Sequence, residues 1–251
     1  MIWVIDSHIH MHDNEYDEIL DHIVNLMKKN NMKACCVSTD YNSSIKTMSL
    51  CTKSDLFLPF IGMHPNQIYD NMEIFIKFAE SNISQIKGFG EIGLDKTYPQ
   101  IDNEYKKQIS CFMLQLELAE KFNKPVSIHS RNTIDDVCSI LSSYSIPKIS
   151  LHWFDGNKKQ LSKAMELGFF VSYGPLLVYA KDKQYLLSKT NVNQILVETD
   201  GPVKFSNCFR RRYTQPSLIY SVILSASKIL DMEYTELTKI LEINSTNFLC
   251  I

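Results

Sequence analysis

The feature of this sequence that most constrains its fold is a regular alternation of short apolar runs with amphipathic stretches. Each apolar run has the length of a buried strand, and each stretch after it carries apolar residues at helical spacing. Eight such units follow one another, with no linker, low-complexity segment or sequence repeat between them. The predicted strands are 2–5, 34–37, 56–61, 86–89, 126–128, 149–151, 169–172 and 195–197.

The stretches between these strands predict helices. The long helix expected at 103–122 carries one apolar stripe, formed by Ile109, Phe112, Met113, Leu116 and Ala119. Ser43 or Ser44 is expected to cap the helix that follows the second strand. The other predicted helices lie at 16–30, 72–80, 133–143, 157–167, 181–188, 216–230 and 235–241.

Alternating strands and helices favour a parallel sheet with helices outside it. Eight units favour closure into a (β/α)8 barrel, and the length of 251 residues matches the ~250 residues typical of that fold. We therefore predict an α/β protein with a single TIM-barrel domain over residues 1–251. A doubly wound open sheet is the alternative.

The composition narrows the setting in which this chain works. A formal net charge of −2 gives no overall basic field, so non-specific nucleic-acid binding through total charge is not expected, although a local basic groove is compatible with it. Seven scattered cysteines without a Cys-x-x-Cys pair predict free thiols in a reducing compartment. Neither a signal peptide nor a membrane span is found, so we expect a cytoplasmic protein of unknown oligomeric state.

Potential metal ligands lie at the carboxyl ends of the predicted strands, where barrel enzymes carry their active sites. His8 and His10 follow the first strand two residues apart, so their imidazoles should project together. Neutral imidazole is a common ligand for divalent metals. The remaining candidates each follow a different strand, and they are Glu91, His129, His152 and Asp200.

Six nitrogen and oxygen ligands exceed the needs of one four-coordinate ion and suit two ions that share a carboxylate. Two ions ~3.5–4 Å apart can stabilise both the attacking and the leaving oxygen of a phosphoryl transfer. Mixed imidazole and carboxylate ligands permit zinc or manganese and suit magnesium less well. We expect two divalent metal ions whose identity the residues leave open.

Six short motifs occur along the chain in a fixed order: DSHIH at 6–10, GMHP at 62–65, GEIGLD at 90–95, PVSIHSR at 125–131, HWFDG at 152–156 and ETDGP at 198–202. Each motif alone is weakly specific. The ordered set, which spans essentially the whole chain, resembles the TatD family of metal-dependent deoxyribonucleases in the amidohydrolase superfamily.

The resemblance implies a TIM barrel with a two-metal site that hydrolyses DNA phosphodiester bonds. It implies that His8, His10 and Asp200 bind one metal. It also implies that Glu91 bridges the ions and that His129 and His152 hold the second. Asp200 and Glu91 are the expected catalytic residues, Asp200 as the acceptor of a proton from the attacking water.

Several positions depart from the usual family pattern. Trp153 and Asp155 stand where the family commonly has Cys and Ser, and Gly201 stands where it has Ser. The segment 214–216 replaces the usual Asn-x-Pro, and the segment 173–177 also differs. None of these changes removes a ligand, but they bear on the substrate, because loops at the barrel mouth set specificity.

Two candidates for substrate contact lie near the expected site. His64 could hydrogen-bond a substrate phosphate or orient the attacking water, and the alternative is that it only orders the turn before Pro65. Arg131 has a guanidinium suited to phosphate oxygens, and the alternative is a solvated loop residue. Asp95 could orient a ligand or a helix terminus.

A basic segment follows the eighth strand, where Arg210, Arg211 and Arg212 are flanked by Phe209 and Tyr213. Basic residues interleaved with aromatic residues can bind single-stranded nucleic acid through phosphate contacts and base stacking. The alternative is an exposed charged loop. Trp153 could stack on a base or simply pack.

Three functions remain in consideration. The first is a two-metal phosphodiesterase with DNA as its substrate. The second keeps the site and hydrolyses a small lactone, amide or phosphoester. The third, a non-catalytic binding scaffold, is disfavoured because all six candidate ligands are present.

Overall fold

The computed structural model describes residues 2–67, 72–97 and 104–251. Eight strands form one sheet in chain order, and every hydrogen-bonded pair of neighbours is parallel. The strands are β1 (Val4–Ile9), β2 (Met32–Val37), β3 (Phe57–Ile61), β4 (Gly88–Asp95), β5 (Val126–Arg131), β6 (Ile149–Leu151), β7 (Phe170–Tyr173) and β8 (Ile195–Val197). The predicted TIM barrel is confirmed, and the open doubly wound sheet, whose strand order would reverse, is wrong.

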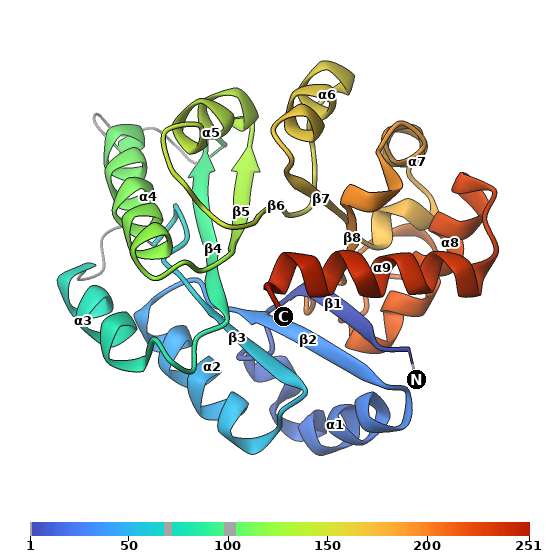
Figure 1. Cartoon of the computed structure of the whole chain (residues 1–251). Coiled ribbons are helices and arrows are strands. Elements are labelled where there is room, and N and C mark those ends of the chain that lie inside the picture. The colour runs from blue at the N-terminus through green and yellow to red at the C-terminus, as the bar shows by residue number, and fades with distance from the viewer. Residues whose placement is uncertain (1, 68–71, 98–103) are drawn as a thin grey trace.

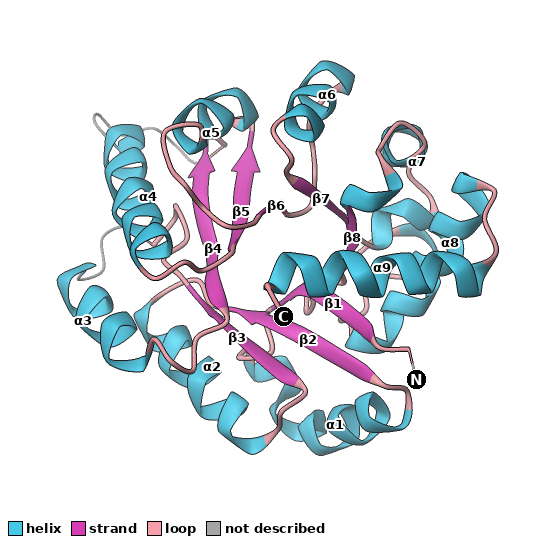
Figure 2. Cartoon of the chain, viewed as in Figure 1, coloured by secondary structure: helices cyan, strands magenta, loops and turns pink. Residues whose placement is uncertain are grey.

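Helices surround the ring of strands (Figure 1, Figure 2). They are α1 (Leu20–Lys29), α2 (Tyr41–Lys53), α3 (Met72–Asn82), α4 (Glu104–Lys121), α5 (Ile134–Leu141), α6 (Lys158–Glu166), α7 (Lys181–Leu187), α8 (Ile219–Leu230) and α9 (Tyr234–Leu249). The helix predicted at 16–30 is divided, because a 3-10 helix at Asn14–Ile19 precedes α1. The first residue of the helix predicted at 103–122 lies outside the described residues.

The predicted cap of α2 is wrong. Asp40 caps the helix, and its carboxylate accepts a hydrogen bond of 2.6 Å from the Ser43 backbone N–H. Ser43 is the third residue of the helix, and its hydroxyl oxygen accepts a hydrogen bond of 2.9 Å from the Asp40 N–H. This reciprocal capping box satisfies two backbone donors, whereas a cap without a partner at the third helical residue would satisfy one.

Three strands extend further than the sequence predicted. β1, β4 and β5 continue to Ile9, Asp95 and Arg131, whereas their apolar runs end several residues earlier. The added residues include polar ones that are nevertheless buried, among them Ser7, His8, Glu91 and Asp95. Hydrophobicity therefore marks too early an end wherever a strand carries functional side chains into the barrel mouth.

The barrel closes where β1 meets the residues after β8. The backbone N–H of Asp200 donates a hydrogen bond of 3.0 Å to the His8 carbonyl, and the His10 N–H donates one of 2.8 Å to the Gly201 carbonyl. The buried Asp6 carboxylate accepts a further bond of 3.0 Å from the Thr199 N–H. These bonds bring candidate ligands from the first and last strands into the same end of the barrel.

The last helix closes the barrel interior. α9 crosses in front of the barrel in Figure 1, and the C-terminus lies beside β1 and β2. Its fully buried Phe248 packs with Phe60 and Phe170, at centroid distances of 5.8 and 6.0 Å. The sequence predicted this helix only over 235–241, so it missed the turns that carry Phe248 into the interior.

Two further features concern the cysteines and the helices. All seven cysteines are free, and Cys35, Cys36, Cys111 and Cys138 are buried.

Within the described ranges, no helix combines the length and the apolar character that crossing a membrane requires.

Candidate metal centre

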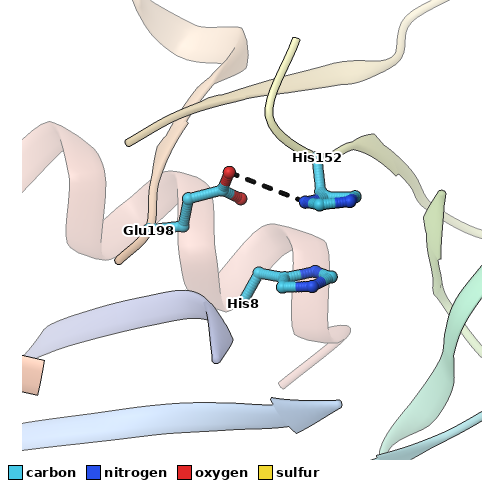
Figure 3. Close-up of side chains that lie close together, drawn as sticks. All are labelled: His8, His152 and Glu198. Carbon is cyan, nitrogen blue, oxygen red and sulfur yellow. Dashed lines mark ion pairs between the residues drawn. The ribbon is translucent and has the colours of Figure 1, made fainter. Parts of the chain in front are cut away.

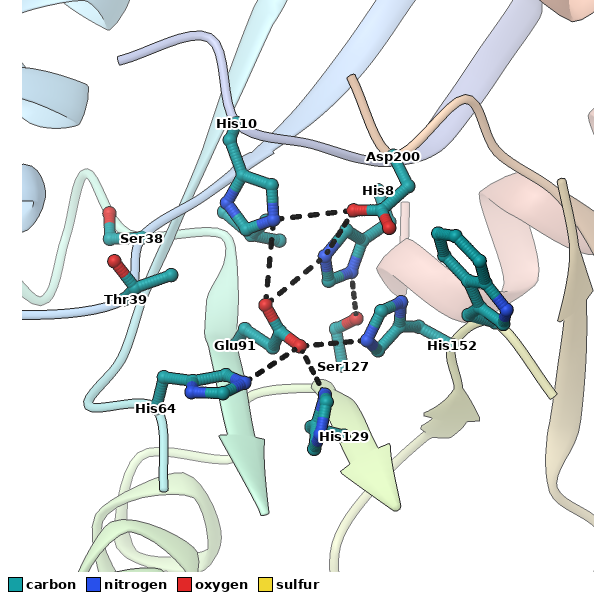
Figure 4. Close-up of polar contacts among 12 residues, drawn as sticks. His8, His10, Ser38, Thr39, His64, Glu91, Ser127, His129, His152 and Asp200 are labelled. Atoms are coloured by element: carbon teal, nitrogen blue, oxygen red, sulfur yellow. Dashed lines mark hydrogen bonds and ion pairs between the residues drawn. The ribbon is translucent and has the colours of Figure 1, made fainter. Parts of the chain in front are cut away.

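Glu91 lies at the centre of a polar cluster inside the barrel mouth (Figure 4). The β4–β5 register shifts between Phe89 and Ile92, next to this residue. The Glu91 N–H donates a hydrogen bond of 2.7 Å to the Ser38 carbonyl, and the Ser38 N–H donates one of 3.1 Å to the Gly90 carbonyl. These bonds tie β4 to the end of β2 and hold the Glu91 carboxylate, which is buried, on the barrel axis.

One carboxylate oxygen of Glu91 faces the first pair of histidines. Its Oε2 lies 3.5 Å from His10 Nε2 and 3.6 Å from His8 Nε2. The same two nitrogens lie 3.3 and 3.7 Å from Asp200 Oδ1. His8, His10, Asp200 and one oxygen of Glu91 therefore converge, although they come from β1, β4 and the segment after β8.

The orientation of His8 is fixed from below by β5. Its Nδ1 lies 2.9 Å from the Ser127 hydroxyl, so its Nε2 points toward the carboxylates. This Nε2 is buried and has no hydrogen-bond partner among the described residues. Burial lowers the pKa of His8 below its usual value, and the neighbouring His152 lowers it further. Burial thus favours the neutral imidazole, whose Nε2 can bind a metal ion when Nδ1 donates to Ser127.

The other carboxylate oxygen of Glu91 faces three more histidines. Its Oε1 lies 2.7 Å from His129 Nδ1, 2.8 Å from His152 Nε2 and 3.4 Å from His64 Nε2. The second ring nitrogen of His129 lies 2.8 Å from Asp95 Oδ2. Two carboxylates therefore bind the two ends of the His129 ring.

The charges in this half of the cluster stabilise one another. Burial alone would raise the pKa of Glu91, but His64, His152 and His129 lower it well below its ordinary value. Burial alone would lower the pKa of His129, and hydrogen bonds to Asp95 and Glu91 raise it instead. The pKa of His152 is likewise raised well above its ordinary value, chiefly by Glu91 against the effect of burial.

The spacing of the donor atoms suits divalent cations. Metal–ligand distances of ~2.0–2.2 Å at tetrahedral angles separate two ligand atoms by about 3.4 Å. The separations of 3.3 to 3.7 Å among His8, His10, Asp200 and Oε2 of Glu91 match that value. On the other side, His129 and His152 hydrogen-bond Glu91 directly, so an ion there would replace protons shared with the carboxylate.

Glu198 supports the cluster from the β8 side (Figure 3). Its fully buried carboxylate accepts hydrogen bonds from the Trp153 N–H at 2.7 Å and the Ser172 hydroxyl at 2.5 Å. One of its oxygens also lies 3.7 Å from His152 Nδ1. The rings of His8 and His152 stack at a centroid distance of 3.8 Å. Glu198 therefore helps to hold His152 in place.

A cavity of about 280 Å³ opens onto this cluster. Its described lining residues are His10, Glu91, His129, Ser130, Arg131, His152, Trp153, Asp155, Asp200 and Val203. Five of the six candidate ligands, among them both candidate catalytic residues, thus share a surface that a substrate can reach.

The structure brings together all six residues predicted as metal ligands. His64, predicted as a substrate contact, lies in the same cluster beside Glu91. Arg131, the last residue of β5, is exposed and lines the cavity.

The basic segment that follows β8 lies outside the described lining of the cavity. Arg210, Arg211 and Arg212 are exposed in a loop joined at its base by a bridge between Lys204 and Tyr213. They are not among the described residues that line the cavity.

Two residues of the cluster were missed by sequence reasoning. Ser127 lies two residues before His129 on β5, and Glu198 lies two residues before Asp200. His8 and His10 were identified by the same rule, because residues two positions apart in a strand lie on the same face. Applied to every strand end, that rule would have found both residues.

The comparisons with known proteins agree on one family. The sequence pattern of the family described as TatD related DNase matches residues 5–249. Deoxyribonuclease TATDN3 of Homo sapiens is 24% identical over 99% of this chain and 94% of its own. The uncharacterized metal-dependent hydrolase YabD of Bacillus subtilis is 24% identical over 94% of this chain and 95% of its own.

Solved structures show the same fold. The TatD homologue YjjV of Escherichia coli superimposes with a TM-score of 0.90 at 21% identity, covering 99% of this chain and 98% of its own. A TatD family hydrolase of Entamoeba histolytica gives 0.88 at 19% identity, covering 98% of each chain. The family match over nearly the whole sequence confirms the resemblance drawn from the six motifs. This chain therefore belongs to the TatD related DNase family of metal-dependent hydrolases.

Proposed function

We propose that this protein is a deoxyribonuclease that hydrolyses DNA phosphodiester bonds with two divalent cations. The observation that carries the proposal is that the two oxygens of the Glu91 carboxylate face different histidines. Its Oε2 faces His8 and His10, whereas its Oε1 faces His129 and His152. A single carboxylate with a different set of imidazoles on each oxygen is suited to bridge two ions.

His8, His10 and Asp200 would hold one ion, and His129 and His152 would hold the other. His64 is a further candidate for the second set, since its Nε2 also faces Oε1 of Glu91. Two ions in this position would activate water and stabilise charge on the phosphate oxygens. The number of imidazoles favours zinc or manganese over magnesium.

Asp200 is the proposed proton acceptor. Its Oδ1 faces His8 and His10, and the residue lines the cavity. A carboxylate at the edge of the cavity can accept the proton that the attacking water loses. Glu91, enclosed by imidazoles, acts in this proposal as a bridging ligand rather than as a base.

Basic residues at the mouth are proposed to contact phosphate. Arg131 lines the cavity two residues beyond His129, and its guanidinium can bind two phosphate oxygens at once. His64 can orient the water or the phosphate from inside the site. Arg210, Arg211 and Arg212 are exposed, so we assign them to the more distant backbone of a longer substrate.

The choice of DNA rests on the family and on the name of one relative, the human protein called a deoxyribonuclease. One observation favours the alternative, a hydrolase of a small lactone, amide or phosphoester. The cavity of about 280 Å³ is at the small end of ligand pockets, which span ~300–1,000 Å³.

The experiment that tests the proposal is metal reconstitution of chelator-treated protein. Zinc, manganese or magnesium is restored in turn, and hydrolysis of single- and double-stranded DNA is measured beside a panel of lactones and amides. We expect DNA hydrolysis with zinc or manganese. Hydrolysis of a small substrate alone, with every metal, would reject DNA as the substrate.

Elemental analysis tests the bridging role separately. Glu91→Ala should reduce binding of both ions, whereas His129→Ala should mainly reduce binding of one. A Glu91→Ala protein that retains both ions would remove Glu91 from the bridging position.

A further inference from the structure

We propose that Trp153 and Phe205 form a stacking platform for a nucleobase of the substrate, beside the candidate metal centre. The inference rests on the proposed deoxyribonuclease function and adds a base-binding subsite to it. It also explains a departure from the family pattern, in which this position commonly holds Cys.

The indole of Trp153 shares a cavity with Glu91 and Asp200. Its ring stacks on Phe205 at a centroid distance of 5.2 Å and an interplanar angle of 24°. Phe205 is 3% exposed. The ring of Phe209 packs against it in a T-shaped arrangement, with 6.2 Å between the ring centroids. Trp153 itself is only half-buried and lines the cavity, so Phe205 backs an indole that a substrate can reach.

Hydrogen bonds to neighbouring elements fix the backbone of Trp153 and Phe154. The Trp153 N–H donates to the buried Glu198 carboxylate at 2.7 Å, and the Phe154 N–H donates to the Ser172 carbonyl at 3.2 Å. The buried Lys183 ammonium donates to the Phe154 carbonyl at 3.2 Å and also to the Asp155 carboxylate. The segment after β6 therefore cannot move without breaking buried polar contacts.

Trp153 has a positive φ of 40°. A bulky side chain rarely adopts this left-handed region, and such strain persists where the surrounding structure fixes it. Because Trp153 directly follows His152, the strained residue sets the indole at a fixed position relative to a candidate ligand. A preorganised ring costs little entropy when it binds a flat partner.

A nucleobase is the partner that this surface fits. Every base has a π-face, so stacking on an aromatic side chain tolerates any base sequence. An aliphatic lactone or amide has no such face and would gain little. Typical stacking energies correspond to about a 5- to 150-fold gain per base. The platform thus favours nucleic acid over the small aliphatic substrates of the alternative function.

The kinetic test combines changes in the protein with changes in the substrate. Oligodeoxynucleotides carry one tetrahydrofuran abasic residue, placed in turn at each position around the cleaved bond. At one position, loss of the base should lower kcat/KM of the wild type about 5- to 150-fold. Trp153→Ala should lower kcat/KM on the intact oligonucleotide by a similar factor and add no further loss on the abasic one. Trp153→Phe, which keeps a ring, should recover most of the activity.

A binding test needs no catalysis. The chain has two tryptophans, so Trp3→Phe leaves Trp153 as the single fluorescent indole. Titration of this variant with deoxyadenosine monophosphate should quench its fluorescence, whereas deoxyribose 5-phosphate should not. The matched control is Trp153→Phe, in which the remaining Trp3 should not respond.

The outcomes separate this inference from the proposed function. DNA hydrolysis that is indifferent to the abasic residue and to Trp153→Ala would overturn the platform and leave the nuclease proposal standing. Base-dependent quenching without DNA hydrolysis by any metal would reject the nuclease proposal and support the platform as a nucleotide subsite. Equal quenching by the base-free sugar phosphate would overturn the platform.

Discussion

His129 and Glu91 are joined directly, with 2.7 Å between the imidazole Nδ1 and the carboxylate Oε1. The other nitrogen of the ring, Nε2, lies 2.8 Å from Asp95 Oδ2. Ionised carboxylates only accept hydrogen bonds, so both ring nitrogens of His129 carry protons in the metal-free protein. A cation that binds His129 must therefore displace a proton.

Metal binding should consequently depend on pH. Because Asp95 and Glu91 raise the pKa of His129 against the effect of burial, protons compete with the cation below that pKa. Each displaced proton changes the affinity by up to about tenfold per pH unit. The increase in Tm caused by zinc should be larger at pH 8 than at pH 5.5. An increase of the same size at both values would show that His129 is not a ligand.

Asp95→Asn should destabilise the metal-free protein in a pH-dependent way. The raised pKa of His129 contributes stability that is present below its unfolded value of 6.5 and is lost as pH rises through the folded value. The lowered pKa of Asp95, opposed by burial and caused by His129 and Thr97, contributes stability that is present above 3.8 and lost at lower pH. The loss in free energy of unfolding should therefore be largest between these values.

Urea unfolding of chelator-treated protein at pH 5.5 and pH 9 measures this difference. An equal loss at both values would mean that Asp95 acts mainly through its 2.6 Å hydrogen bond from the Thr97 N–H.

Asp200→Asn should separate catalysis from binding. The amide keeps the shape and one oxygen ligand but cannot accept a proton, and general-base contributions are typically ~10²–10⁴-fold. We expect at least about a 10²-fold loss in kcat on DNA at saturating metal, with most of the metal and DNA affinity retained. Activity within about threefold of the wild type would remove Asp200 from the role of base.

Replacing Arg210, Arg211 and Arg212 with glutamine should act on long substrates. If these exposed residues contact phosphates, KM for DNA should rise and the salt dependence of binding should weaken. Turnover of a small chromogenic phosphodiester should change little, because the three residues do not line the described part of the cavity. Equal losses on both substrates would indicate that the loop supports the structure of the site.

Phe248→Ala should destabilise the barrel. Phe248 is fully buried between Phe60 and Phe170, and removal of such a ring typically costs ~3–5 kcal/mol. Ile243→Ala is the matched control on the same helix, since Ile243 is 57% exposed and surface changes usually stay within ~0.5 kcal/mol. Urea unfolding measures both variants. Similar free energies of unfolding for the two variants would contradict the assignment of Phe248 to the barrel core.

The sequence predicted the strands whose apolar runs match their full length, and it predicted the ligands that lie at strand ends. β6 and β8 have the predicted bounds, and the six candidate ligands lie together because parallel strands end at the same side of a barrel. The extents of β1, β4 and β5 could not be predicted, since their polar residues are buried by other strands. The contact of Phe248 with the interior also depends on residues far away in the sequence.

Other predictions stay as they were made. The roles of Arg131 and of Arg210, Arg211 and Arg212 depend on a substrate, and exposure alone does not decide them. The single domain over residues 1–251 and the cytoplasmic location stay predictions from the sequence, and the metal identity stays open. By contrast, His64 can now be assigned to the cluster, because its Nε2 lies 3.4 Å from Glu91 Oε1.

The place where the barrel closes gives the proposed ions a mechanical role. His8 and His10 lie on one side of the line where β1 meets the residues after β8, and Asp200 lies on the other. An ion held by all three would act as a cross-link between segments far apart in the chain, and such links restrict the unfolded ensemble. Removal of the ions by a chelator would then loosen the barrel where β1 meets the residues after β8, rather than evenly around its circumference.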